Sequence, residues 1–340
     1  MRTLLIDGYW NLKRNYHKLR DPQHMMYECG GTLGFLNSLR ATINKVIPDR
    51  VVVMWDGRFS GKFRHDIYPP YKSKRKKEWD LQSEIELKGQ NLNLNDYNRD
   101  TYSLSNQKII LQEILEELSI RQCEVEFIEA DDLIASYCIQ ADPTEQIFIN
   151  ARDKDYRQIV SENVSIITPD DLRIITFQNF KQIIGHTIEN ELFLKCFIGD
   201  GSDCVKGVNG ITENKLIKYF PAIKDEKYTY KRLVAETKEM ASKKKLVFFD
   251  KILECEETIY LNARLMNLKK PFLTQNAIDE VKFIQTAPLG LDRNVKAVFE
   301  IFSKHRYNEL LQVDVNYYLS PFNIIVQKER EYYNSKVLKK

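Results

Sequence analysis

Long apolar runs, paired cysteines and internal repeats are all missing from the sequence. No apolar stretch approaches the roughly 20 residues that a membrane-spanning helix needs, and no signal peptide precedes the first apolar run. The cysteines show no C-x-x-C spacing, which argues against a zinc site and against a secreted disulfide framework. They are Cys29, Cys123, Cys138, Cys196, Cys204 and Cys255. We therefore expect an intracellular protein with reduced cysteines and no membrane association.

An excess of charge of one sign is also missing. The 51 basic and 48 acidic residues leave a net charge of +3, so the distribution of the charges is more informative than their balance. Acidic residues gather after apolar runs, and basic residues gather at 62–77 and 243–245. This pattern fits a polyanion held on a basic surface beside an acidic pocket that binds cations. A length of 340 residues predicts a main domain and a second lobe.

Four short apolar runs, rich in β-branched residues, are each followed by acidic residues. They predict strands at 2–7, 50–56, 124–128 and 146–150, and the acids that follow them are Asp7, Asp56, Glu129, Asp131, Asp132, Asp153 and Asp155. Continuous apolar strands are typical of a parallel sheet that is buried on both faces. We therefore predict an α/β fold in which these carboxylates meet at one edge of the sheet.

Carboxylates held side by side repel one another and raise each other's pKa unless cations neutralise them. Oxygen ligands without clustered His or Cys favour Mg²⁺ or Mn²⁺. For residues 127–137 taken alone, an acidic helix start explains the sequence equally well, because Asp and Glu favour the positive end of the helix dipole. The repetition of the pattern at four strands favours the metal site.

The remaining pattern predicts mostly helix, with a pair of strands at 164–168 and 172–177 that we expect to be antiparallel. Helical spacing of apolar residues indicates helices at 32–46, 107–118, 131–139, 154–160, 189–198 and 213–219. Adjacent prolines argue against a helix at 62–75, and the polar stretch 76–100 suggests a mobile insertion. Residues 199–211 form a glycine-punctuated turn between two helices, a construction that can bind phosphate but is a weak signal alone. Asp200 and Asp203 strengthen this signal, because they add two carboxylates beside the phosphate-binding element.

Six ordered motifs resemble those of the 5′-nuclease family, which includes flap endonucleases, the 5′-nuclease domains of bacterial DNA polymerase I and phage 5′→3′ exonuclease/ribonuclease H enzymes. They are L-I-D-G at 5–8, V-V-V-M-W-D at 51–56, F-R-H-D-I-Y-P-P-Y-K-S-K-R at 63–75, E-A-D-D at 129–132, D-K-D at 153–155 and G-D-G-S-D…G-V-N-G-I at 199–211. The resemblance runs from about residue 2 to residue 220. Arg152 before D-K-D and Thr212 in place of a hairpin glycine depart from the family pattern.

The resemblance implies a PIN-like catalytic domain at 1–180, with a mostly parallel sheet flanked by helices and an arch insertion at about 60–106. It implies a helical C-terminal lobe at 181–340 that carries a helix-hairpin-helix-type motif at about 189–220. Residues 221–340 form an extension without assigned motifs, and the expected location is the cytoplasm of a bacterium or of a phage-infected host cell.

The resemblance also implies the site residues. One metal region would use Asp7, Asp56, Glu129 and Asp131, and the second region or its surroundings would use Asp132, Asp153, Asp155, Asp200 and Asp203. Lys72 and Arg75 would meet the scissile phosphate, although a solvated basic loop is the alternative for both. The expected DNA contacts are Arg14, Arg64, Tyr71, Lys72, Arg75, Lys206, Gly207, Val208, Gly210 and Lys215. We expect Gly207 to allow close approach of the backbone to a duplex phosphate.

The function implied is hydrolysis of DNA phosphodiesters in replication or repair by two Mg²⁺ ions, with Mn²⁺ as a substitute and K⁺ expected at the hairpin. The substrates would be DNA with a 5′ flap or 5′ end, and also RNA–DNA hybrids. A monomer with a replication protein bound to its C-terminal lobe is a further expectation. A PIN-type ribonuclease and a catalytically silent DNA-junction-binding protein are the alternatives.

Overall fold

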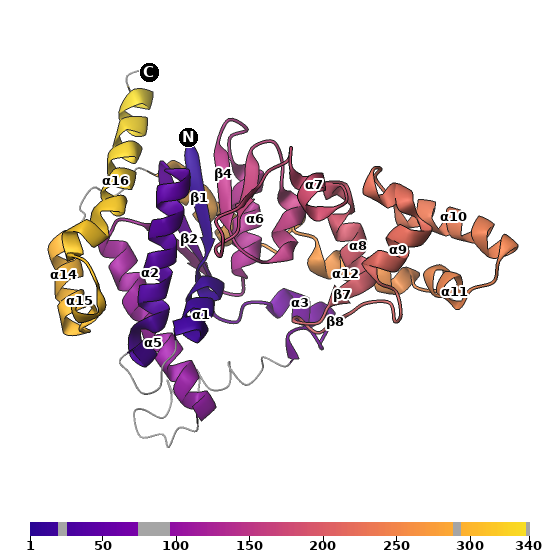
Figure 1. The fold of residues 1–340 in the computed structure, drawn as a ribbon, viewed down its shortest axis with the longest axis horizontal. Coiled ribbons are helices and arrows are strands. Elements are labelled where there is room, and N and C mark those ends of the chain that lie inside the picture. Colours follow the sequence, from indigo (N-terminus) through magenta and orange to yellow (C-terminus); the bar gives the residue numbers. More distant parts are fainter. Residues whose placement is uncertain (20–25, 74–95, 288–293, 338–340) are drawn as a thin grey trace.

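The four acid-terminated apolar runs form four adjacent strands of one six-stranded sheet (Figure 1). A computed structural model describes residues 1–19, 26–73, 96–287 and 294–337. The strand order is β3-β2-β1-β4-β5-β6, and the pairs are parallel except for antiparallel β5–β6. The strands are β1 (Arg2–Asp7), β2 (Arg50–Asp56), β3 (Arg121–Val125), β4 (Gln146–Asn150), β5 (Val164–Ile167) and β6 (Ile174–Ile175). This confirms the predicted α/β fold and the antiparallel pair.

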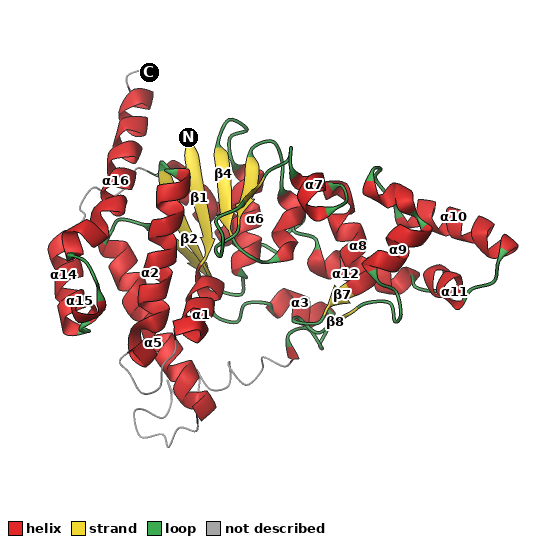
Figure 2. Ribbon diagram, viewed as in Figure 1, coloured by secondary structure: helices red, strands yellow, loops and turns green. Residues whose placement is uncertain are grey.

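Helices cover both faces of the sheet (Figure 2). One face packs against α1 (Gly8–Leu19), α2 (Met26–Val46), α5 (Asp96–Glu117), α14 (Val295–Lys304), α15 (Tyr307–Leu310) and α16 (Val315–Val337). The other packs against α6 (Ala130–Gln140), the 3₁₀ helix η2 (Lys154–Ile159), α7 (Phe180–Ile184) and α13 (Gln275–Thr286). Alternate residues of one strand enter opposite cores, as Leu4 and Leu5 do. Burial on both faces explains why the strands read as continuous apolar runs.

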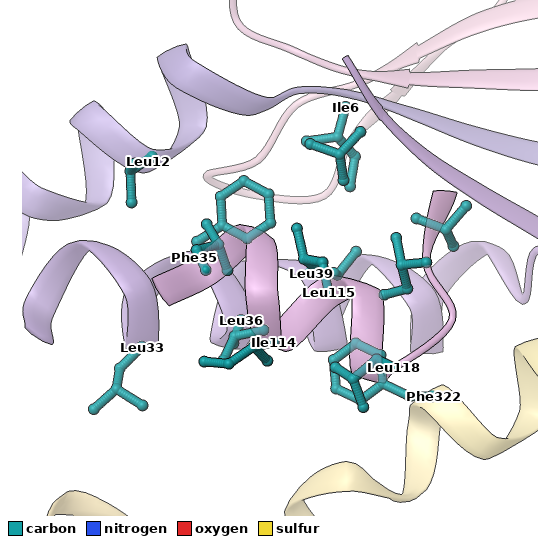
Figure 3. Close-up of a cluster of buried hydrophobic side chains, with 14 of the residues drawn as sticks. Ile6, Leu12, Leu33, Phe35, Leu36, Leu39, Ile114, Leu115, Leu118 and Phe322 are labelled. Carbon is teal, nitrogen blue, oxygen red and sulfur yellow. The ribbon is translucent and has the colours of Figure 1, made fainter. Parts of the chain in front are cut away.

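The first core is built from residues far apart in the sequence (Figure 3). Leu36 of α2 and Ile114 of α5 pack beneath Ile6 of the central strand, and Phe322 of α16 closes the cluster. Each of these side chains is almost fully buried. The C-terminal helix is therefore part of the sheet's own core.

A helical lobe extends away from the sheet, with α10 and α11 farthest from it (Figure 1). It contains the 3₁₀ helices η3 (Ile188–Asn190) and η4 (Pro221–Lys224), α8 (Glu191–Ile198), the two-stranded hairpin β7 (Gly199–Asp200) and β8 (Val205–Lys206), α9 (Glu213–Tyr219), α10 (Tyr230–Lys243), α11 (Val247–Leu253) and α12 (Glu256–Met266). Its core includes Phe197, Leu216 and Phe249. The helix predicted at 213–219 is confirmed by α9.

The division at residue 180 stays a prediction, but the packing beyond α12 bears on it. Helices α13 to α16 bury Val281, Phe302 and Leu319 in the two cores of the sheet. We therefore place residues 275–287 and 294–337 with the sheet, and 188–266 with the lobe proper.

Local corrections concern segments where the sequence pattern was ambiguous. Strand β3 ends at Val125, three residues before the predicted end, because the chain turns at Glu126 and Phe127, and the φ of 70° at Phe127 excludes a strand. Helix α1 was not predicted, and α2 and α5 begin earlier than their apolar spacing indicated.

The prediction of no helix at 62–75 was wrong for its first part. Helix α3 spans Lys62–Ile67 and ends before Pro69, because proline restricts the residue before it but not those farther upstream. Arg75 and most of the polar stretch 76–100 lie outside the described residues. Among the helices that are described, none is long and apolar enough to cross a membrane.

Glu191, in the first turn of α8, should make stability depend on pH. Burial raises its pKa to about 7, with Glu213 adding repulsion and Arg157 opposing it. One of its oxygens accepts no hydrogen bond from the described residues, although His186 lies 3.6 Å away. The unfolded chain loses the proton near pH 4.5, so the free energy of unfolding should fall as pH rises from about 4.5 to 7, by at most about 3 kcal/mol.

Urea unfolding of the wild type and of Glu191→Gln across this pH range measures the effect. The difference between the two proteins should change with pH in that window and be constant above it. A difference that is flat throughout would show that Glu191 ionises normally in the folded protein.

Candidate active site

Carboxylates from neighbouring strands meet at the carboxyl edge of the sheet, as predicted. Asp7 and Asp56 end β1 and β2, Asp131 lies in the first turn of α6, and Asp153 caps η2 after β4. The backbone N–H of Ala130 donates to Asp56 Oδ1 at 2.9 Å, which ties the start of α6 to the end of β2. We call Asp7, Asp56, Asp131 and Asp153 the carboxylate cluster.

The members of the carboxylate cluster repel one another. Burial raises the pKa of Asp7 to about 8, and the charges of Asp56 and Asp153 contribute, although the N–H of Trp10 opposes them at 3.0 Å from Oδ1. Burial likewise raises the pKa of Asp131 well above its usual value, with further contributions from Asp153 and Asp7. A cation that enters the cluster would relieve this repulsion, so the repulsion favours cation binding.

Tyr156 holds Asp131 in place through a hydrogen bond. Its ring is fully buried and its hydroxyl donates a hydrogen bond to Asp131 Oδ1. The position of Tyr156 directly after Asp155 is the one sequence signal for this role. A buried hydroxyl needs a partner, and the carboxylate supplies it.

Glu129 lies beside the carboxylate cluster but is paired with basic residues. The Lys72 ammonium and the Arg64 guanidinium each bind one of its oxygens, and the Tyr71 hydroxyl lies 3.1 Å and 3.2 Å from the two. Burial would raise the pKa of Glu129, but Lys72 and Arg64 outweigh burial and lower it to about 2. The same contact outweighs the burial of Lys72 and raises its pKa well above the usual value. Glu129 is therefore ionised and Lys72 is protonated across the physiological range.

Arg64 and Asp132 form a buried ion pair. The guanidinium donates to both oxygens of Asp132, at 2.5 Å and 2.8 Å, and to the carbonyl of Leu265 at 2.8 Å, and it lies over the ring of Phe272. The Phe272 N–H also donates to Asp132.

This placement changes three expected roles. Arg64 and Tyr71 are buried, so the expectation that they contact DNA is not supported, and both instead hold Glu129 in place. Both oxygens of Asp132 are occupied by Arg64, which argues against a metal ligand and makes Asp132 the anchor of that arginine.

Lys195 of α8 pairs with two further acids, Asp155 and Asp200. Both acids were predicted as site residues from the sequence, but Lys195 was not. Its ammonium binds Asp155 and lies 2.9 Å from Asp200 Oδ2. Burial would raise the pKa of Asp200, but Lys195 and the hydroxyl of Ser202 lower it well below the usual range. The sequence signal was weak, because a lysine four residues before the glycine turn looks like any helix-surface residue.

The segment of Lys72 and the lobe hairpin are joined directly. The backbone N–H of Lys72 donates to the Asp203 carbonyl at 2.9 Å, and the Tyr71 hydroxyl donates to Asp203 Oδ2 at 3.1 Å. The structure thus brings Asp200 and Asp203 to the same site as Lys72 and Glu129, although they lie more than 120 residues after Lys72 and more than 70 after Glu129 in the chain.

The hairpin glycine Gly207 has a different role from the expected one. A Cβ at this position would lie 2.1 Å from the Ile198 carbonyl oxygen and 2.5 Å from that of Phe197. The Val208 N–H is also bonded to the Phe197 carbonyl, at 2.7 Å. Gly207 therefore allows β8 to cross the end of α8, and the Val208 N–H is not available to a phosphate.

Gly207→Ala should lower the free energy of unfolding by at least about 1–3 kcal/mol, because the clashing atoms are backbone and the hairpin must shift. Gly201→Ala is the matched control, since its Cβ would meet nothing within 4 Å. Denaturant unfolding of both variants measures the difference. Equal stability of the two would show that the close crossing tolerates a methyl group.

Two of the other expected DNA contacts are lysines at the surface of the lobe. Lys206 and Lys215 are exposed, and Lys215 donates to the Gly210 carbonyl at 2.9 Å. Thr212 caps α9 by accepting the Lys215 N–H at 3.3 Å, so the departure from the family pattern supplies a helix cap. Arg14 pairs with Asp170, and Arg152 lies 3.7 Å from the same carboxylate.

The chemistry of the carboxylate cluster suits divalent cations, although its present geometry is not a finished coordination sphere. In the part of the chain that the structure describes, no three His, Cys, Asp or Glu side chains are grouped closely enough to hold a metal ion. The donors are carboxylate oxygens whose mutual repulsion a divalent cation would relieve. The cluster therefore fits such an ion by donor type and charge.

The sequence motifs and this arrangement agree with a match to a known family. A family model described as the 5′-3′ exonuclease, N-terminal resolvase-like domain, matches residues 2–185. The chain belongs to this family. Members include a 5′-3′ exonuclease of Mycoplasmopsis pulmonis, 28% identical over 224 residues that cover 62% of this chain and 63% of that protein. Another is a 5′-3′ exonuclease of Buchnera aphidicola subsp. Schizaphis graminum, 25% identical over 232 residues, or 65% of this chain and 71% of that protein.

Solved structures show the same fold over more of the chain. Bacteriophage T5 5′-exonuclease with bound zinc ions gives a TM-score of 0.58 at 14% identity, covering 90% of this chain and 100% of that one. A pseudo-enzyme-product complex of the T5 flap endonuclease with DNA and metal ions gives 0.55 at 16% identity, covering 89% and 100%. The shared fold covers more of the chain than the residues 2–185 that the family model matches.

Proposed function

We propose that this member of the 5′-3′ exonuclease family is a divalent-metal-dependent 5′-nuclease that hydrolyses DNA phosphodiesters at 5′ ends and 5′ flaps. The observation that carries the proposal is the carboxylate cluster at the sheet edge, with the protonated Lys72 held beside it by Glu129. The T5 enzyme that shares this fold was solved with metal ions and DNA. Activity on the RNA of RNA–DNA hybrids and a role in DNA replication or repair belong to the same proposal.

In the proposed mechanism, Asp7, Asp56, Asp131 and Asp153 would hold Mg²⁺, or Mn²⁺ in its place. Bound at this cluster, divalent cations reduce the repulsion between substrate and site and lower the pKa of the attacking water. Lys72 supplies positive charge toward the phosphate as negative charge develops on its oxygens, and its burial makes that charge effective.

The remaining residues position these groups. Tyr156 fixes the orientation of Asp131 through its hydrogen bond. Arg64 holds Glu129 in place, and Glu129 in turn holds Lys72. Lys195 holds Asp155 and Asp200 together. A K⁺ ion at the hairpin, a monomeric state and a replication protein on the C-terminal helices stay predictions.

The test compares a 5′-flap DNA, an RNA–DNA hybrid and a single-stranded RNA, each with Mg²⁺, Mn²⁺ or EDTA. We expect the flap DNA to be cut with either metal and to stay intact in EDTA, because the cluster alone would repel the phosphodiester. Asp131→Asn, purified in parallel, controls for contaminating nucleases. Cleavage of single-stranded RNA alone would identify a ribonuclease, and binding of flap DNA without any cleavage would identify a silent junction-binding protein.

A further inference from the structure

A pair of stacked phenylalanines lies in the two loops beside the carboxylate cluster. Phe59 comes three residues after Asp56, and Phe127 comes two residues before Glu129. Their ring centroids are 6.0 Å apart and their planes differ by 22°. Phe59 belongs to the connection from β2 to α3, which runs along the carboxyl edge of the sheet (Figure 1). The pair is thus placed by the same two loops that place the acids.

The two loops are locked together by their backbones. The Gly57 N–H donates to the Ile128 carbonyl at 3.0 Å, and the Phe127 N–H donates to the Arg58 carbonyl at 2.7 Å. A Cβ at Gly57 would lie 1.7 Å from the carbonyl oxygen of Val125, so only glycine permits this approach. The stacked pair therefore sits on a rigid base.

Burial of apolar surface does not explain the pair. Phe59 and Phe127 have φ angles of 58° and 70°, a region that bulky side chains rarely adopt and that costs free energy. Phe59 nevertheless leaves 37% of its surface exposed. Strained residues that stay exposed are concentrated at binding and catalytic sites, and this pair adjoins the candidate one.

A planar cation completes the group. Arg58 is exposed, and the central carbon of its guanidinium lies 4.8 Å from the centroid of the Phe59 ring. Aromatic rings stack on nucleobases without regard to base identity, and arginine adds a flat stacking surface together with a charge for the neighbouring phosphate. A base within a duplex is already stacked on its neighbours, so such a group suits an unpaired one.

We propose that Arg58, Phe59 and Phe127 form a stacking site for an unpaired nucleobase of the DNA strand, next to the phosphodiester that is cut. The inference rests on the proposed nuclease function and assigns a position to the single-stranded part of the substrate. The Phe59 and Phe127 side chains have no hydrogen-bond donors or acceptors that distinguish bases, so their stacking tolerates any sequence and favours single strands.

The test places 2-aminopurine, a fluorescent base that stacking quenches, at each of the first three unpaired positions of a 5′-flap DNA. Binding is followed in Ca²⁺ to suppress cutting. We expect quenching at one position with the wild type, its loss with Phe59→Ala, and its retention with Phe59→Trp. Flap affinity should fall by about 5- to 10-fold in Phe59→Ala, the lower range for loss of one base stack, whereas affinity for a duplex without a flap should change less than about twofold.

Phe283→Ala is the matched control, because Phe283 lies on α13 with 65% of its surface exposed. It should change neither the quenching nor either affinity. Quenching that survives in Phe59→Ala, or affinity that falls equally for both DNAs, overturns the stacking site. If the wild type cuts flaps in Mg²⁺ but quenches 2-aminopurine at no position, the stacking site is overturned and the proposed nuclease function stands. If the wild type quenches 2-aminopurine but never cuts, the stacking site stands and the proposed nuclease function is contradicted.

Discussion

Lys72→Ala should slow single-turnover cleavage of a 5′-flap DNA by about 10²- to 10³-fold, the usual cost of removing one charged contact to the transition state. The half-buried ammonium keeps its proton because of Glu129, so it is a fixed positive charge at the edge of the carboxylate cluster. Affinity in Ca²⁺ should fall less than about threefold, since one phosphate contact among many contributes little to binding.

The backbone at Lys72 makes the test specific. Its φ of 48° is held by the N–H bond to Asp203, and alanine leaves that bond intact. Lys72→Arg should recover part of the rate because it restores the charge, and Lys62→Ala is the control, as Lys62 forms an exposed pair with Asp66 in the same segment. A folded Lys72→Ala protein that cuts at the wild-type single-turnover rate would return Lys72 to a structural role.

Arg64→Ala should have the largest effect on stability, lowering the free energy of unfolding by about 3–5 kcal/mol. The substitution leaves Glu129 and Asp132 buried, with fewer partners for their charges. It also leaves the Leu265 carbonyl without the donor it now has, and breaks the link from α3 to α12.

Denaturant unfolding of metal-free protein measures this effect. Lys243→Ala provides the comparison, because Lys243 pairs with Glu239 at an exposed helix position, and such pairs contribute about 0.3–0.5 kcal/mol. Arg64→Lys should recover only part of the loss, since an ammonium cannot bond both oxygens of Asp132 and reach Leu265 at once. A loss below about 1 kcal/mol in Arg64→Ala would mean that water or a shift of the chain replaces the guanidinium.

The parts of the site that sequence predicted are those set by local pattern. Asp7 and Asp56 follow continuous apolar runs, and the parallel sheet then fixes them at one edge. The end of β3 was misplaced because Phe127 and Ile128 are as apolar as strand residues, and only the close approach of the next loop shows that they turn.

The residues that sequence missed act across long separations. Lys195 and Tyr156 carry no motif of their own and gain a role only when the lobe and η2 fold against the acids. The pairing of Arg64 with Asp132 was not predicted, because a family-like motif says which residues matter and not which of them are buried against each other. Gly207 shows the same limit, since the glycine was expected to face a phosphate and instead faces a carbonyl of its own chain.

The closing of the sheet's cores by α13 to α16 has a consequence for synthesis on the ribosome. Ile6 and Leu36 near the start of the chain share a core with Phe322, so their native surroundings are incomplete until 316 and 286 further residues, respectively, have been made. Contacts of such long sequence separation form slowly, and a chain that waits for them exposes apolar surface. We expect the nascent sheet to depend on chaperones until α16 emerges and docks against α2.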